Sequence, residues 1–137
     1  MLADFDHSRM VFPPEIVPTT QRPDVVLWST STRRVFLIEL TCPAEENIEI
    51  ASVFKASKYK ELADAIEQAG WTVGVKPIEV GARGCVARSV PRLLREFGFS
   101  SREATTAVRT LATVVARCSF TIYLAASRPE WQKPALL

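Results

Sequence analysis

Two acidic residues of this chain stand beside or within predicted strands and could together hold a divalent metal ion. Glu39 lies in the apolar run Val35–Leu40, which is rich in β-branched and aromatic residues and is typical of a buried strand. Burying an ionised carboxylate is costly unless it meets a metal, a cation or a hydrogen-bond network. Asp24 opens the neighbouring run, Val25–Trp28, so a hairpin would bring both carboxylates to one side of the sheet. Such paired oxygens suit Mg²⁺ or Mn²⁺.

A purely structural explanation of the same pair stays open at this point. Glu39 could form a salt bridge with a buried arginine or lysine, and Asp24 could cap a turn. These two residues alone do not separate the two explanations.

Two lysines on the next predicted helix bear on this choice. The helix is expected from about Ile48 to Ala69, where Gly70 ends it. At ~100° per residue its apolar side chains share an arc of roughly 120°, and Lys55 and Lys58 fall inside that arc. Long lysine stems can snorkel from an apolar stripe. Either lysine is therefore a candidate to pair with the carboxylates, to orient a water or to stabilise charge on a phosphate.

The acidic pair and the lysines follow one another in the order Pro23-Asp24, Glu39-Leu40-Thr41 and Lys55-x-x-Lys58-Tyr59. This order resembles the motif of the PD-(D/E)XK, or restriction-endonuclease-like, nuclease family. The resemblance implies metal-dependent hydrolysis of phosphodiester bonds in DNA, with Asp24, Glu39 and the carbonyl of Leu40 holding Mg²⁺ or Mn²⁺.

The chain departs from this motif at the position of its lysine. The family's lysine falls two residues after the glutamate, on the same strand face, and this chain has Thr41 there. A threonine hydroxyl carries no charge, so the resemblance implies that Lys55 or Lys58 supplies the lysine function from the helix. Lys55 and Tyr59 also match the spacing of the Q-x-x-x-Y helix element of RecB-like members, with lysine in place of glutamine.

The sequence from about residue 22 to residue 98 is also similar to endonuclease-like domains found beside reverse transcriptases in animal retroelements. The resemblance implies a restriction-endonuclease-like core of the α/β or α+β class, with a central mixed sheet flanked by helices. The first core helix of that family is not evident before residue 22, so either it is absent or the chain is a fragment of a longer protein. DNA is the expected partner, with RNA as the alternative, and a mobile-element origin would place the protein in the nucleus.

A local cluster of basic residues could contact phosphates. Arg83 lies in a Gly-Ala-Arg-Gly loop, and Arg88, Arg92 and Arg95 surround a short predicted helix. Ordinary solvated charge is the competing explanation for this cluster. Tyr59 of the helix element is assigned to the same nucleic-acid surface.

The predicted elements are strands followed by helices, which is typical of an α/β or α+β sandwich. Two further strands are predicted near Leu2–Phe5 and over Trp71–Val80, and Pro77 limits the second strand or marks an edge. A short helix is predicted between Pro91 and Gly98. A longer helix follows, and the capping box of Ser100 and Glu103 marks its start. Size and composition predict one domain over residues 1–127 and a flexible tail over residues 128–137.

Composition argues against several other functions. The 137 residues include one histidine and three widely separated cysteines, which argues against structural zinc, disulfides and Ser-His or Cys-His catalysis. The net charge of +2 means that any nucleic-acid surface must be local. No signal peptide is evident, and arginines at 109 and 117 interrupt the apolar stretch 107–126. We therefore expect an intracellular protein without a membrane partner, and a homodimer stays open.

Three hypotheses remain from the sequence. The first is an active metal-dependent endonuclease module, and the second is a catalytically degenerate module of the same fold that binds nucleic acid or a protein partner. Thr41 and the missing first helix favour the second. The third is an unrelated interaction domain in which Glu39 forms a structural ion pair with Lys55 or Lys58. Metal binding separates the first from the third, and cleavage separates the first from the second.

Overall fold

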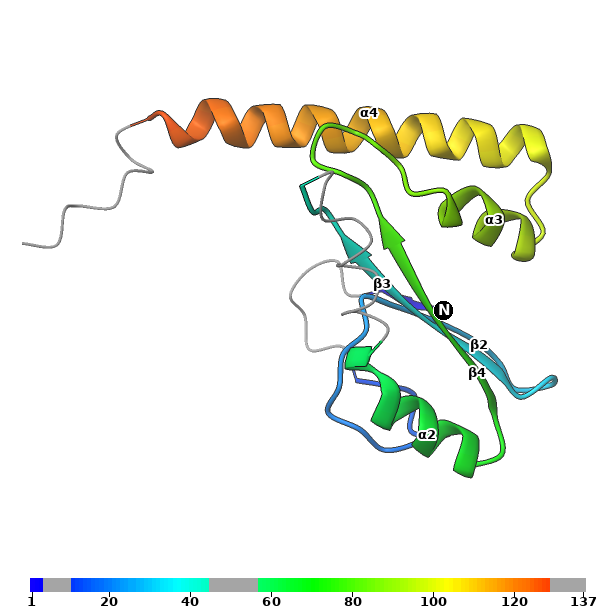
Figure 1. Cartoon of the computed structure of the whole chain (residues 1–137). Coiled ribbons are helices and arrows are strands. Elements are labelled where there is room, and N and C mark those ends of the chain that lie inside the picture. The colour runs from blue at the N-terminus through cyan, green and yellow to red at the C-terminus, as the bar shows by residue number, and fades with distance from the viewer. Residues whose placement is uncertain (4–10, 45–56, 129–137) are drawn as a thin grey trace, which may run out of the picture. The chain divides into compact units, whose positions relative to one another are not determined.

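The computed structural model describes residues 1–3, 11–44 and 57–128, and the chain divides into two compact units (Figure 1). The first unit comprises Met1–Thr41 and Glu49–Glu79. The second comprises Cys42–Ile48 and Val80–Leu137. The single domain expected over residues 1–127 stays a prediction.

The first unit is built on a four-stranded mixed sheet, so the protein belongs to the α+β class. Its strands are β1 (Leu2–Ala3), β2 (Val25–Ser29), β3 (Arg34–Thr41) and β4 (Thr72–Glu79), and they lie in that order across the sheet (Figure 1). Neighbouring pairs are antiparallel except β3 and β4, which are parallel. A parallel pair needs a crossover connection, and this one contains helix α2 (Lys60–Gln68).

The predicted hairpin is confirmed in β2 and β3. Their register runs from Ser29 opposite Arg34 to Val25 opposite Ile38. The turn between them includes Arg33 with a positive φ of 48°. The register fixes which residues share a face, because successive side chains of a strand point to opposite sides.

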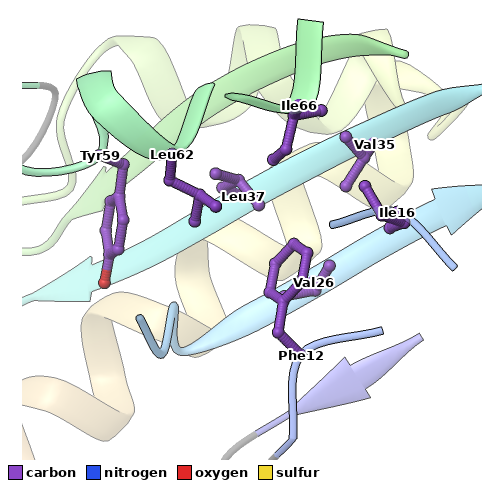
Figure 2. Packing of buried hydrophobic residues seen from close by; sticks show 8 residues of the cluster. All are labelled: Phe12, Ile16, Val26, Val35, Leu37, Tyr59, Leu62 and Ile66. Carbon is purple, nitrogen blue, oxygen red and sulfur yellow. The ribbon is translucent and has the colours of Figure 1, made fainter. Parts of the chain in front are cut away.

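One face of the sheet carries the core of this unit. Val26, Val35 and Leu37 lie on this face and pack with Leu62 and Ile66 of α2 (Figure 2). Three further buried side chains complete the cluster: Phe12, Ile16 and Tyr59. Removing this apolar surface from water is the main stabilising term of the unit.

Strand β4 lies at the edge of the described sheet, as the proline in the predicted strand Trp71–Val80 suggested. Pro77 pairs with Glu39 in the parallel register and has no N–H to donate. An edge position tolerates this loss because one side of the strand has no neighbour to bond.

Helix α2 covers the C-terminal part of the helix predicted from about Ile48, and Ser57 and Lys58, which precede it, are also helical. Its N-terminal cap is Tyr59, whose φ of −103° and ψ of 14° are not helical. Residues 45–56 of the predicted helix, Lys55 among them, lie outside the described residues. Lys58 therefore lies in a helical segment that Tyr59 separates from α2.

The second unit contains α3 (Ser89–Glu96) and α4 (Ser101–Ala126), which pack on each other. The predicted capping box is confirmed, since the Ser100 hydroxyl accepts from the backbone N–H of Glu103 and the Glu103 carboxylate accepts from that of Ser100. These hydrogen bonds lower the pKa of the Glu103 carboxyl. Val90, Leu93 and Ala104 are buried in this unit.

Helix α4 is long and apolar enough to cross a membrane by length and composition alone. Large apolar side chains near its C-terminal end are exposed: Phe120, Ile122, Tyr123 and Leu124. Length and composition are weak evidence, and the expectation of no membrane partner stays a prediction. The predicted flexible tail, apart from Arg128, lies outside the described residues.

We predict that Gly84→Ala destabilises the second unit more than Gly98→Ala does. Both glycines have a positive φ, of 92° and 93°, so each alanine should cost about 1–2 kcal/mol of backbone strain. A Cβ on Gly84 would also lie 2.6 Å from the carbonyl oxygen of Ala112, whereas Gly98 faces open space. Thermal unfolding of both variants measures the difference. Equal melting temperatures would contradict the close packing of Gly84 on α4.

Candidate functional site

The carboxylate of Asp24 lies beside the C-terminal half of β3. Asp24 immediately precedes β2, and extending the antiparallel register by one pair places it opposite Glu39. Its Oδ2 accepts a hydrogen bond of 2.7 Å from the backbone N–H of Leu40. The predicted proximity of Asp24 to Glu39 and Leu40 is therefore seen in the structure, although this contact uses the N–H of Leu40 and not its carbonyl.

Glu39 is buried, with 3 % of its surface exposed, and both carboxylate oxygens have donors. Lys58 Nζ lies 2.9 Å from Oε1. The Tyr59 hydroxyl donates to Oε2 at 2.7 Å. The charge that looked anomalous in the sequence is thus satisfied by an ammonium group and a phenol from consecutive residues.

Tyr59 holds Glu39 from within the core. Its side chain lies among the buried cluster (Figure 2), and its hydroxyl also lies 3.2 Å from the backbone carbonyl oxygen of Arg22. Burial raises the pKa of the Tyr59 hydroxyl far above its usual value, and the hydrogen bond to Glu39 and the negative charges of Glu39 and Asp24 raise it further. Tyr59 therefore stays a neutral donor. This positioning role replaces the nucleic-acid contact expected of Tyr59, because its side chain is buried.

Lys58 reaches the carboxylate from the surface. Its side chain is 45 % exposed, while that of Glu39 is 4 % exposed, so the salt bridge joins a partly solvent-exposed cation to a buried anion. The ammonium group also lies 4.7 Å from the centroid of the Tyr59 ring. The structure thus selects Lys58 as a partner of Glu39, and it does not describe Lys55.

A third carboxylate lies on the same strands and was not selected from the sequence. Thr41, the residue at the position of the motif lysine, pairs with Glu79 in the parallel register. Glu79 is 1 % exposed, and its Oε1 has no hydrogen-bond partner in the structure. The signal that could have found it is the one that identified Glu39, a carboxylate within a predicted strand.

The predicted donors are oxygen atoms, which are the ligands that a hard divalent ion prefers. Among the described residues, no three His, Cys, Asp or Glu side chains form a group that could hold a metal. The predicted set contains two carboxylates and one carbonyl, and Mg²⁺ commonly binds through one or two carboxylates while keeping several waters. A metal ion at Glu39 would compete with Lys58 for the carboxylate.

The arginines predicted to contact phosphates lie in the second unit. Arg83, Arg88, Arg92 and Arg95 are all exposed. Arg88 caps α3 and Arg92 follows one turn later, so these two share a helix face.

No family model, curated protein or solved structure matches this chain. The resemblance to the PD-(D/E)XK nucleases therefore stays a prediction from the motif residues. The first core helix of that family is not tested, since residues 4–10 lie outside the described part of the chain.

We predict that Tyr59→Phe lowers the free energy of unfolding by about 1.5–3 kcal/mol, because it removes a buried donor to a charged group. A raised pKa in the folded state means that the contribution of Tyr59 is complete below about pH 10 and is lost as the pH rises above that value. The variant should therefore lose less stability at alkaline pH than the wild type. Denaturant unfolding at pH 7 and above pH 10 measures both effects.

Tyr123→Phe is the matched control, because Tyr123 is 74 % exposed and removal of its hydroxyl should change little. Equal stability of the two variants at pH 7 would contradict the role of Tyr59.

Proposed function

We propose that this chain hydrolyses phosphodiester bonds in DNA with Mg²⁺ or Mn²⁺ bound at Asp24 and Glu39. One observation supports the proposal most strongly. Glu39 carries a buried carboxylate on β3, next to Leu40, whose N–H donates to Asp24. The ammonium group of the partly exposed Lys58 lies 2.9 Å from Oε1 of Glu39. Acidic oxygens next to a solvent-accessible lysine form a set that can bind a metal and a phosphate together.

The side chains of the site would have different roles in the reaction according to their charge. Asp24, Glu39 and the Leu40 carbonyl would hold the metal, which when bound lowers the pKa of a water ligand and neutralises phosphate charge. Tyr59 would keep the Glu39 carboxylate oriented, because its neutral hydroxyl already donates to Oε2. Lys58 would exchange its contact with Glu39 for the phosphate, where its positive charge stabilises the transition state. Thr41 would contribute an uncharged oxygen at the position of the motif lysine.

DNA is the proposed substrate, with RNA as the alternative. The exposed arginines of the second unit, Arg83, Arg88 and Arg92, supply positive charge suited to phosphates, which a net charge of +2 does not supply by itself. Contacts of this kind position a duplex without reading its sequence.

A second candidate function is a binding module of the same fold without catalysis. The observation that favours it is that both oxygens of Glu39 already have donors, so its burial is satisfied without a metal. Thr41 in place of lysine points the same way. Cleavage distinguishes the two candidates.

We predict cleavage of supercoiled plasmid or oligonucleotides by the folded chain in Mg²⁺ or Mn²⁺, abolished by EDTA. Asp24→Asn and Glu39→Gln should each abolish it, because each removes a negative charge from the metal site. Glu67→Gln, on the exposed face of α2, is the control and should cleave normally. Gel assays measure the products. Metal-dependent cleavage that persists in Glu39→Gln would contradict the proposal, and no cleavage by the wild type would favour the binding module.

We predict that Lys58→Met lowers the rate of cleavage by roughly 10²–10³-fold, because it removes a cation that stabilises phosphate charge. Binding of Mn²⁺ should persist, since the lysine competes with the metal for Glu39. Lys60→Met, two residues further along the chain and exposed, is the control. Single-turnover kinetics measure the rate. An unchanged rate in Lys58→Met would show that Lys58 has no catalytic part.

A further inference from the structure

The second unit carries a strong excess of positive charge. Residues 80–128 contain eight arginines, two glutamates and no lysine, aspartate or histidine, which gives a net charge of +6. The whole chain carries only +2, so the rest of it has a net negative charge. All eight arginines are exposed, and three of them lie on α4: Arg102, Arg109 and Arg117. This asymmetry along one chain favours a polyanionic partner for the second unit.

One row of exposed side chains runs along α4. Residues spaced alternately by four and three positions lie on one face of a helix. At ~100° per residue the row spans an arc of roughly 100°, and its members are Arg102, Thr106, Arg109, Thr113, Phe120 and Tyr123. All six are exposed, and the row contains no acidic residue. Among the residues that the structure describes, neither Arg102 nor Arg109 has an acidic partner.

The apolar stripe of α4 lies on the other side of the helix and packs within the second unit. Ala104 is buried, and Val108, Leu111 and Val115 are partly buried. Helix α3 packs on the first half of α4 (Figure 1). A helix that lies in the plane of a membrane needs an uncovered apolar face along its length. Over its first turns α4 instead presents arginines and threonines to solvent, which suits phosphates better than lipid.

The Gly-Ala-Arg-Gly loop lies beside the middle of this row. Gly84 comes so close to α4 that a Cβ on it would lie 2.6 Å from the carbonyl oxygen of Ala112 and 3.3 Å from the Cβ of Ala116. Ala116 lies between Arg109 and Phe120 along the helix. Arg83, the exposed residue before Gly84, therefore adds a third arginine close to the row.

The row ends in two aromatic rings that face water. Phe120 is 61 % exposed and Tyr123 is 74 % exposed, one turn further along α4. Arginines that contact phosphates, next to aromatic rings that stack on bases, are the components of a surface for single-stranded nucleic acid. A duplex keeps its bases paired and stacked inside, so only a single strand offers base faces to these rings.

We propose that this row, together with Arg83, binds single-stranded nucleic acid. Arg83, Arg102 and Arg109 contact phosphates, and Phe120 and Tyr123 stack on bases. The proposal goes beyond the proposed function, since binding at this row needs neither a metal ion nor the Glu39 carboxylate. It assigns a role to arginines and aromatic rings of α4 that the proposed cleavage does not use.

Fluorescence anisotropy of a labelled DNA oligonucleotide, measured with the full chain in EDTA, tests the proposal without cleavage. The wild type should bind the single strand more tightly than its duplex. Phe120→Ala should weaken binding of the single strand roughly 5- to 100-fold and change duplex binding little, because it removes a stacking ring. Arg109→Gln should reduce the logarithmic salt dependence of single-strand binding by a slope of about 0.7, because one phosphate contact is lost.

Matched variants control for general effects of substitution. Ile122→Ala is the control for Phe120→Ala, because Ile122 is 59 % exposed on the same turns of α4 but lies off the row. Tyr123→Phe keeps its ring and should bind as the wild type does, whereas Tyr123→Ala should bind more weakly. Lys60→Gln removes an exposed charge of the first unit and should bind normally. Melting temperatures confirm that each variant is folded.

The outcomes separate this surface from the proposed function and from a membrane surface. Weaker single-strand binding in Phe120→Ala but not in Ile122→Ala supports the surface, even if the wild type cleaves no substrate. Equal affinity of Phe120→Ala and the wild type overturns it, while cleavage that depends on Glu39 would leave the proposed function intact.

Vesicles of phosphatidylcholine and phosphatidylserine test the membrane alternative by sedimentation with the full chain. We expect no binding that competes with the oligonucleotide. Binding to these vesicles that Phe120→Ala and Ile122→Ala weaken equally, without binding to the single strand, would overturn the proposal in favour of a lipid surface.

Discussion

The candidate site depends on the cost of burying one negative charge. Glu39 lies in a strand whose neighbours are apolar, and the folded chain meets its carboxylate with Lys58 on one oxygen and Tyr59 on the other. A charge that is desolvated and held by two donors is fixed in orientation, since either contact would be lost on rotation. The same constraint explains why Tyr59, despite its polar hydroxyl, is part of the apolar cluster.

This arrangement joins the core to the proposed chemistry. Leu62 and Ile66 of α2 pack on β3, and that packing places Tyr59 and Lys58, at the start of the helix, over Glu39. The antiparallel pairing of β2 with β3 brings the Asp24 carboxylate to the backbone N–H of Leu40. In the proposed mechanism Lys58 would be the exchangeable member, because its side chain is 45 % exposed and could leave the carboxylate for a phosphate.

Local patterns predicted much of the fold. The apolar runs predicted strands β2 and β3, and Pro77 suggested that β4 is an edge strand. Ser100 and Glu103 marked the start of α4. Each of these patterns lies within a few residues of the element that it predicts. The helical arc could not choose between Lys55 and Lys58, since both fall inside it. The non-helical Tyr59 and the buried Glu79 were missed because they depend on packing and on a parallel register between strands distant in sequence.

Anomalous diffraction from crystals of the chain soaked in Mn²⁺ would show directly whether Asp24 and Glu39 bind a metal ion. We expect an anomalous peak at Asp24 and Glu39, with the Lys58 ammonium group displaced from Glu39 and the Tyr59 hydroxyl still bonded to Glu39. Crystals that keep the contact between Lys58 and Glu39 and show no peak at these carboxylates would contradict a metal site here, because the buried charge would then serve only the fold.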